Sequence, residues 1–292
     1  MATVSQWVSG ARPRTLPAAV APVLVGTGVA ANADGVIWLR AVLALGVSVG
    51  LQIAVNYAND YSDGVRGTDA VRVGPFRLTG SGAAVPAAVR TAAVFAFGIA
   101  AALGVILAAE TSWWLIAVGA ASIAAAWLYT GGPRPYGYIG LGEVFVFAFF
   151  GLVAVCGTTF VQLRAVPTLA VAVAVAMGLL ACAILVINNL RDIPSDAIAG
   201  KRTLAVRIGD HNTRLLYVSL LGGAFVVAGL VAVLIDHAHW AAIAFVAAPL
   251  AVRPVRTVLH GASGRDLIAV LGDTGRLQLA YAILLAAGLA VR

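Results

Sequence analysis

The sequence has little charge and almost no cysteine. Charged residues make up 11% of the 292 positions and hydrophobic residues 61%, with a mean hydropathy of +0.97, which excludes an ordinary soluble domain. The two cysteines, Cys156 and Cys182, lie in apolar stretches and indicate packing residues rather than a disulfide framework or metal site. The four histidines lack zinc-ligand spacing. Phosphate-binding loop and nucleophile-elbow motifs are also absent.

Long apolar runs account for most of the chain. Crossing a bilayer takes about 20 residues in a helix, and the runs are continuous rather than alternating, so they predict helices and not a barrel. The fold class is therefore an all-α membrane protein with about nine transmembrane helices. The predicted spans are 16–33, 37–58, 87–108, 112–130, 139–162, 167–188, 214–235, 238–257 and 275–291.

The distribution of cations predicts the orientation. With a cytoplasmic N-terminus, all of the nineteen basic residues except Arg40, Arg164 and Arg292 fall on the inner side. The net charge of +7 is largely this topology signal, and because the basic residues are scattered over separate loops, we expect no nucleic-acid binding. We expect a multi-pass protein of the cell membrane. The amphipathic stretch TVSQWVSGARPR is expected at the membrane interface, without a cleavable signal peptide.

The few acidic residues are unevenly distributed. Five of the twelve fall in NDYSDGVRGTD at 59–69 and NNLRDIPSD at 188–196. Each stretch follows an apolar span at its cytoplasmic end, the second and the sixth, which suggests two four-helix halves and a ninth helix. A single aspartate there often caps a helix or is solvated. The clusters need another explanation, because like charges three or four residues apart on a helix repel one another.

A divalent cation would offset this repulsion. Mg²⁺ prefers oxygen ligands and is commonly held by one or two carboxylates together with phosphate oxygens. We therefore predict that Asp60 and Asp63 face Asp192 and Asp196, bind Mg²⁺, and through it bind a diphosphate. The site would open to the cytoplasm above an apolar cavity, an arrangement that suits an isoprenyl diphosphate.

Basic residues follow both acidic clusters and are candidates for diphosphate contacts. Membrane anchoring alone would account for about half of them. Lys201 is the only lysine in the chain, so a compact ammonium is present where arginine is otherwise used throughout. The candidates are Arg66, Arg77, Lys201 and Arg202.

At these residues the sequence resembles the UbiA superfamily of intramembrane aromatic prenyltransferases. The first motif of that family is Asn-Asp-x-x-Asp-x-x-x-Asp, which Asn59, Asp60 and Asp63 match. The second is Asp-x-x-x-Asp, which Asp192 and Asp196 match. The resemblance implies a single domain over 1–292, with nine transmembrane helices around a central cavity.

The chain departs from the first motif at its last position. Gly67 stands there, and Asp69 follows two residues later, so the role of Asp69 stays open. This variant resembles the branch that prenylates 1,4-dihydroxy-2-naphthoate in menaquinone biosynthesis. The further stretches that resemble this branch lie at 11–28, 73–82, 129–151 and 188–209.

The resemblance implies a Mg²⁺-dependent enzyme. The four aspartates of the two motifs, with Asn59 in support, would hold Mg²⁺ and grip an all-trans polyprenyl diphosphate. The dihydroxynaphthoate ring would attack the allylic cation and lose its carboxylate as CO₂, and demethylmenaquinone would result after oxidation. Four further residues are candidates for contacting the aromatic substrate or stabilising the cation. Tyrosines are also expected at membrane interfaces for other reasons. The four candidates are Tyr61, Tyr129, Arg134 and Tyr138.

Two alternatives remain. The same fold would serve another acceptor, such as 4-hydroxybenzoate. A cation-coupled transporter would use the acids as its ion site, but it would want them near the bilayer midplane, where only Glu143, at the inner start of a span, is a candidate.

Overall fold

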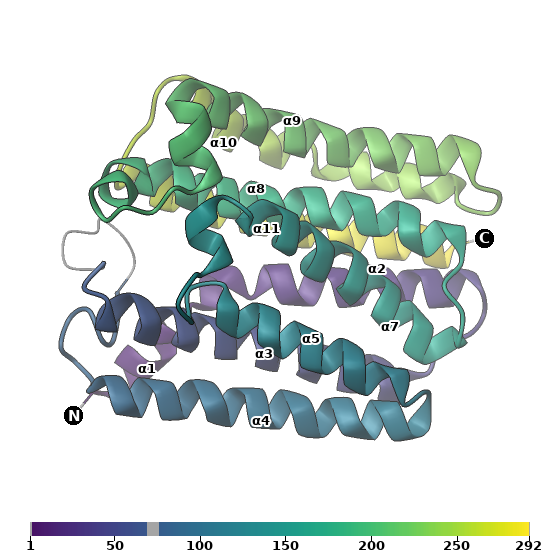
Figure 1. Ribbon diagram of the computed structural model, residues 1–292. Helices are drawn as coiled ribbons and strands as arrows, with labels where there is room; N and C mark the ends of the chain where they lie inside the picture. Colours follow the sequence, from purple (N-terminus) through teal and green to yellow (C-terminus); the bar gives the residue numbers. More distant parts are fainter. Residues whose placement is uncertain (1, 69–75, 292) are drawn as a thin grey trace.

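A computed structural model describes residues 2–68 and 76–291, and every regular element within them is helical. The elements form one elongated bundle (Figure 1). They are α1 (Val4–Gly10), η1 (Pro13–Thr15), α2 (Pro17–Asn32), α3 (Trp38–Val65), α4 (Pro86–Glu110), α5 (Trp114–Leu128), η2 (Tyr136–Ile139), α6 (Gly142–Val146), η3 (Phe147–Val153), α7 (Ala154–Leu163), α8 (Thr168–Ile198), α9 (Leu204–Leu234), η4 (His239–Ala247), α10 (Pro249–Leu259) and α11 (Asp266–Ala290).

The bundle is that of a multi-pass membrane protein. Six helices in the described residues are long and apolar enough to cross a bilayer: α3, α4, the continuous α6–η3–α7 rod, α8, α9 and α11. Two bent pairs raise the number to eight if each is one span. These are Val4–Thr15 with Pro17–Asn32, bent by 49°, and His239–Ala247 with Pro249–Leu259, bent by 50°. The helix α5 has 15 residues and falls short of the usual length.

The helix α8 occupies the centre. Of its most apolar 18-residue window, 72% is buried inside the protein, more than in any other long helix described. It packs against α9, α11, η3 and α2. A helix that is apolar all round is expected to be buried on all sides, which is what its Ala-, Val- and Leu-rich sequence provides.

The acidic residues of the two clusters that the structure describes, Asp60, Asp63, Asp192 and Asp196, lie on helices. The predicted spans 37–58 and 167–188 end too early, because α3 continues to Val65 and α8 to Ile198. The helices α9 and α11 likewise begin about ten residues before the predicted 214 and 275. Hydropathy detects the part of a helix that lies in lipid, and these helices extend beyond it as polar turns.

A π-helix interrupts the predicted span 139–162. The segment η3 is packed closely on α8, since a Cβ added to Gly151 would lie 2.7 Å from the Cα of Gly178. Such wide turns inside α-helices are frequent at functional sites. This one brings Phe149 and Phe150 into the wall of the central cavity.

Candidate active site

A cavity of about 360 Å³ lies between α3 and α8 and is polar at one end. Asn59 and Asp63, from the last turns of α3, line this polar end, and so do Asp192 and Asp196 from the end of α8. The lining continues between apolar side chains to Leu107, near the opposite end of α4. The structure thus brings the two acidic clusters together at the mouth of one apolar cavity.

The helical register decides which residues of the first cluster face the cavity. Asn59 and Asp63 are four residues apart and therefore lie about 40° from each other around the helix. Asp60 is rotated by about 100° from Asn59 and is not among the cavity-lining residues. Asn59 is held in place by Thr130, whose hydroxyl donates to its Oδ1 at 2.8 Å.

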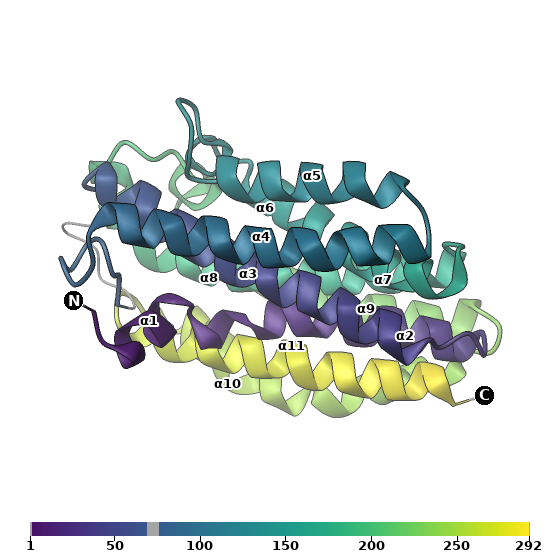
Figure 2. The ribbon, with the colours of Figure 1, turned by 90° about the horizontal axis from the view of Figure 1, so that it is seen from below.

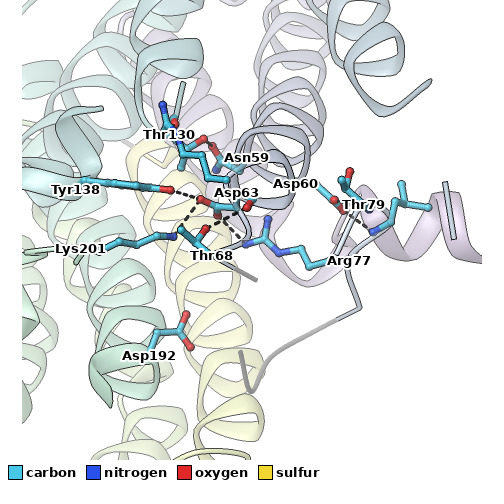
Figure 3. Close-up of polar contacts among 12 residues, drawn as sticks. Asn59, Asp60, Asp63, Thr68, Arg77, Thr79, Thr130, Tyr138, Asp192 and Lys201 are labelled. Atoms are coloured by element: carbon cyan, nitrogen blue, oxygen red, sulfur yellow. Dashed lines mark hydrogen bonds and ion pairs between the residues drawn. The ribbon is translucent and has the colours of Figure 1, made fainter. Parts of the chain in front are cut away.

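Asp63 is the centre of a buried polar network (Figure 3). Its Oδ1 accepts hydrogen bonds from the Tyr138 hydroxyl at 2.6 Å and from Lys201 Nζ at 3.0 Å. Its Oδ2 accepts one from Arg77 Nη2 at 3.4 Å. Two buried cations, Lys201 and Arg77, therefore lie at this wall of the cavity mouth, where they can approach an anionic ligand.

Lys201 and Tyr138 are held in the protonated form. Burial lowers the pKa of Lys201, but the charges of Asp63 and Asp196 and the Tyr138 phenol outweigh it, so the pKa ends above its ordinary value. Burial and then the Asp63 charge raise the pKa of the Tyr138 phenol. The ammonium lies 4.5 Å from the centroid of the Tyr138 ring, an attractive cation–π geometry. Lys201 therefore remains a cation beside the cavity, and the Tyr138 hydroxyl remains a donor to Asp63.

Asp60 points away from this network. Its carboxylate accepts backbone N–H groups from Leu78 at 2.7 Å and Thr79 at 2.9 Å, and the residue is fully buried (Figure 3). It therefore anchors the segment that carries Arg77 rather than facing Asp63, Asp192 or Asp196. The expectation that Asp60 shares the cavity face with Asp63 is wrong, because the backbone amides of Leu78 and Thr79 hold its side chain in the protein interior, away from the cavity.

We expect Asp60→Asn to lower the free energy of unfolding by about 2 kcal/mol, since an amide accepts at one oxygen only and leaves a buried N–H without a partner. Thermal unfolding of the detergent-solubilised protein measures the change. Glu110→Gln is the matched control, because the Glu110 side chain is 58% exposed at the far end of α4 and should have little effect. Equal melting temperatures for Asp60→Asn and the unmodified protein would contradict the anchoring role.

The second cluster is partly neutralised by its own helix. Asp192 is buried, and its two oxygens accept from Nε and Nη2 of the neighbouring Arg191 at 2.7 and 2.8 Å. Asp196 is half-buried one turn later and lines the same cavity. Its backbone carbonyl accepts from the N–H of Lys201 at 2.8 Å, which fixes the turn that returns the lysine to the cavity.

The four candidate cations for a diphosphate separate into two groups. Arg77 and Lys201 are buried and line the cavity. Arg66 and Arg202 are exposed and do not line it. Arg66 donates to the backbone carbonyls of Thr130 and Gly132, and its guanidinium lies 5.3 Å from the Tyr138 ring centroid. Asp69 lies outside the described residues.

The aromatic-substrate candidates separate in the same way. Tyr129 and Tyr138 line the cavity. Tyr61 packs instead against Trp127, with ring centroids 6.3 Å apart, and Arg134 is exposed in the loop after α5. The structure thus brings two of the four into the cavity.

Sequence reasoning missed most of an aromatic column along one cavity wall, consisting of Tyr129, Tyr136, Phe145 and Phe149. Tyr129 meets Tyr136 edge-on at 5.5 Å, Tyr136 stacks on Phe145 at 3.9 Å, and Phe145 stacks on Phe149 at 6.2 Å. All four line the cavity. The only signal in the sequence was the four-residue spacing of the two phenylalanines. Asn189, which also lines the cavity, was missed although it lies within the second acidic stretch.

The cavity mouth fits a hard divalent cation. Its ligand atoms are carboxylate and amide oxygens, with Asn59 and Asp63 on one wall and Asp192 and Asp196 on the other. In residues 2–68 and 76–291, no three His, Cys, Asp or Glu side chains meet as one complete metal site. Two ligands on each wall match Mg²⁺, which is usually held by one or two carboxylates plus waters and phosphate oxygens.

Comparisons with known proteins agree with this geometry. The model of the UbiA prenyltransferase family matches residues 19–267. The 1,4-dihydroxy-2-naphthoate octaprenyltransferase of Mycobacterium tuberculosis is 56% identical over 99% of this chain and 98% of its own length. The protein of the same name from Escherichia coli is 39% identical over 87% and 85%. The solved structure of a UbiA homolog from Archaeoglobus fulgidus bound to DMAPP and Mg²⁺ superposes with a TM-score of 0.62, at 15% identity over 97% of this chain and 99% of that one.

Proposed function

The chain belongs to the UbiA prenyltransferase family, and from that premise we propose that it transfers a polyprenyl group from an all-trans polyprenyl diphosphate to 1,4-dihydroxy-2-naphthoate. CO₂ and diphosphate are lost, and the product is demethylmenaquinone after oxidation. The observation that carries the proposal is the cavity, whose mouth combines facing oxygen ligands with two buried cations above a long apolar interior. Relatives that carry the naphthoate octaprenyltransferase name over nearly the whole chain support the choice of acceptor.

Mg²⁺ is the proposed cofactor. Asn59 and Asp63 on one wall, and Asp192 and Asp196 on the other, would hold it together with oxygens of the diphosphate. When bound, Mg²⁺ withdraws negative charge from the diphosphate and makes it a better leaving group. Family structures determined with Mg²⁺ and with DMAPP or GPP support this assignment.

The residues of the chain bind the diphosphate, exclude water from the cavity and stabilise the cation. Lys201 and Arg77 donate to phosphate oxygens from their positions beside Asp63, and these contacts strengthen as negative charge develops on the leaving group. The apolar interior accommodates the prenyl tail and excludes water from the allylic cation. The aromatic column offers π-faces to that cation along the cavity wall.

We further propose nine spans in the cell membrane, with the polar cavity mouth and the N-terminus on the cytoplasmic side. The six long helices, the two bent pairs and α5 make up this number. The two termini lie at opposite ends of the bundle, as an odd number requires (Figure 1, Figure 2). Exposed tryptophans at the start of α3, near the start of α5 and in η4 suit the outer interface, and the distribution of arginines suits a cytoplasmic inner side.

The test is prenyl transfer by purified, detergent-solubilised protein given polyprenyl diphosphate and 1,4-dihydroxy-2-naphthoate. We expect product formation that falls to background when EDTA removes divalent cations and returns when Mg²⁺ is added, because the leaving diphosphate depends on the metal. A parallel reaction contains 4-hydroxybenzoate. Product from 4-hydroxybenzoate alone would change the acceptor but retain the transferase. No product from any acceptor, in folded protein, would favour the transporter alternative.

A further inference from the structure

Asn189 is a buried amide on the cavity wall that the diphosphate site does not use. It lies on α8, three residues before Asp192, and lines the cavity with an exposed fraction of 9%. Its Nδ2 donates a hydrogen bond of 2.9 Å to Oε1 of Glu143. Glu143 itself does not line the cavity, so it supports Asn189 from behind.

Glu143 lies at the start of α6 with one side-chain partner among the described residues. Its Oε1 receives the bond from Asn189, while its Oε2 is buried and accepts no hydrogen bond from the described protein. Burying a carboxyl group with one oxygen unbonded is costly. The side chain that does bond to this carboxyl group is the cavity-lining amide of Asn189.

The contact fixes which atom Asn189 presents. The amide nitrogen Nδ2 of Asn189 is the donor in this contact, and the Glu143 oxygen is the acceptor. The atom left for the cavity is the carbonyl oxygen Oδ1, and among the described residues no donor bonds to it. The cavity wall therefore carries an oriented hydrogen-bond acceptor one turn from Asp192.

The neighbouring surface is flat and aromatic. Phe145 lies on α6, two residues after Glu143. Its ring stacks on that of Tyr136 in η2, so two rings of the aromatic column lie close to Glu143. The elements α6 and η3 both pack on α8, which carries Asn189. A planar ligand with a hydroxyl group suits an aromatic wall next to an oriented acceptor oxygen.

We propose that Oδ1 of Asn189 accepts a hydrogen bond from a ring hydroxyl of the aromatic acceptor, and that Glu143 is a positioning residue that holds the amide in this orientation. The inference rests on the proposed prenyl transfer and adds the acceptor subsite to it. A hydroxyl that donates to Asn189 makes the ring more electron-rich and places it beside Asp192, where the diphosphate leaves. Because the amide oxygen would then lose its hydrogen-bond partner, the site also disfavours aromatic substrates that lack the hydroxyl.

The test crosses enzyme variants with acceptors that lack one hydroxyl, namely 1-hydroxy-2-naphthoate and 4-hydroxy-2-naphthoate. We expect Asn189→Leu to lower kcat/KM for 1,4-dihydroxy-2-naphthoate about tenfold, the loss of one hydrogen bond. For the analogue that lacks the bonded hydroxyl, the same variant should change kcat/KM less than about twofold, because no bond is left to lose. The KM for polyprenyl diphosphate should stay unchanged.

Glu143 variants test the positioning role. Glu143→Leu should reproduce the acceptor pattern of Asn189→Leu, whereas Glu143→Gln should restore most of the activity, because a glutamine carbonyl still accepts from Asn189. Gln278→Leu is the matched control: Gln278 is also a buried amide, on α11, and it does not line the cavity. It should leave the acceptor ratios unchanged. Should Asn189→Leu fail to fold, Asn189→Ala serves with the same acceptors.

Two outcomes are distinguishable. A loss of kcat/KM by the same factor for the full acceptor and both analogues would exclude the hydroxyl contact and overturn the inference, although transferase activity would stand. The absence of naphthoate prenylation in the unmodified protein would overturn the proposed function and this inference with it.

Discussion

Replacing Asp63 with asparagine is expected to lower the kcat of prenyl transfer about a thousandfold while the protein stays folded. The carboxylate lies at the cavity mouth and carries the negative charge that faces Lys201 and Arg77. An amide of the same shape removes this charge, so Mg²⁺ binds more weakly and the departing diphosphate is less well neutralised. The measurement is single-turnover product formation at saturating substrates over a titration of Mg²⁺. The Mg²⁺ concentration for half-maximal rate should rise as well.

The matched control is the same substitution three residues earlier. Asp60→Asn removes a carboxylate from the same helix, but one that bonds to the N–H groups of Leu78 and Thr79 outside the cavity. Its main effect should be on melting temperature, with the Mg²⁺ dependence of the rate retained. An equal loss of kcat in both variants, in folded protein, would return Asp60 to the metal site and contradict the assignment made from the register.

The positions of most helices could be predicted from sequence because lipid demands long apolar runs. The predicted spans 16–33 and 87–108 agree with α2 and α4 to within two residues at each end. The ends near the site could not be predicted in the same way. There the helices α3 and α8 leave the apolar layer but continue for seven and ten residues beyond the predicted ends, at 58 and 188, and hydropathy carries no signal for a polar helical turn.

The site could be predicted as a set of residues but not as an arrangement. Clustering of aspartates in a chain with so few acids indicated the cavity mouth, and the structure places Asp63, Asp192 and Asp196 there. The orientation of Asp60 depends on backbone amides eighteen and nineteen residues further along, at Leu78 and Thr79. No local pattern encodes such a long-range contact.

Basic and aromatic residues were harder to assign, since anchoring at the interface and function use the same residue types. Arg66 and Arg202 satisfy the charge pattern as well as Arg77 does, yet only Arg77 turns into the cavity. The lysine was distinguishable because its residue type is unique in the chain. The stacking of Tyr136 on Phe145 joins two elements and follows from the tertiary fold alone.

Replacing Lys201 with methionine is expected to lower kcat/KM for polyprenyl diphosphate about a hundredfold, with the KM for the acceptor nearly unchanged. Methionine keeps the length and apolar stem of lysine but removes the ammonium that bonds to Asp63 at 3.0 Å. The diphosphate then loses a buried cation, and Asp63 loses one of the three side chains that orient it. Steady-state kinetics with each substrate varied in turn measure the effect. Lys201→Arg should recover only part of the lost kcat/KM, because the planar guanidinium of arginine does not fit a buried site shaped for a compact ammonium.

The neighbouring residue supplies the control for the lysine. Arg202→Met removes one positive charge at the adjacent position, but the Arg202 side chain is exposed and lies outside the cavity lining. If a cation must line the cavity to bind the diphosphate, Arg202→Met should change kcat/KM by no more than a few-fold, because exposed charges are screened by water and salt. Comparable losses in Lys201→Met and Arg202→Met would mean that the surface around the cavity mouth attracts the diphosphate by its overall charge. A large loss confined to Lys201→Met would identify the ammonium inside the cavity as the group that binds it.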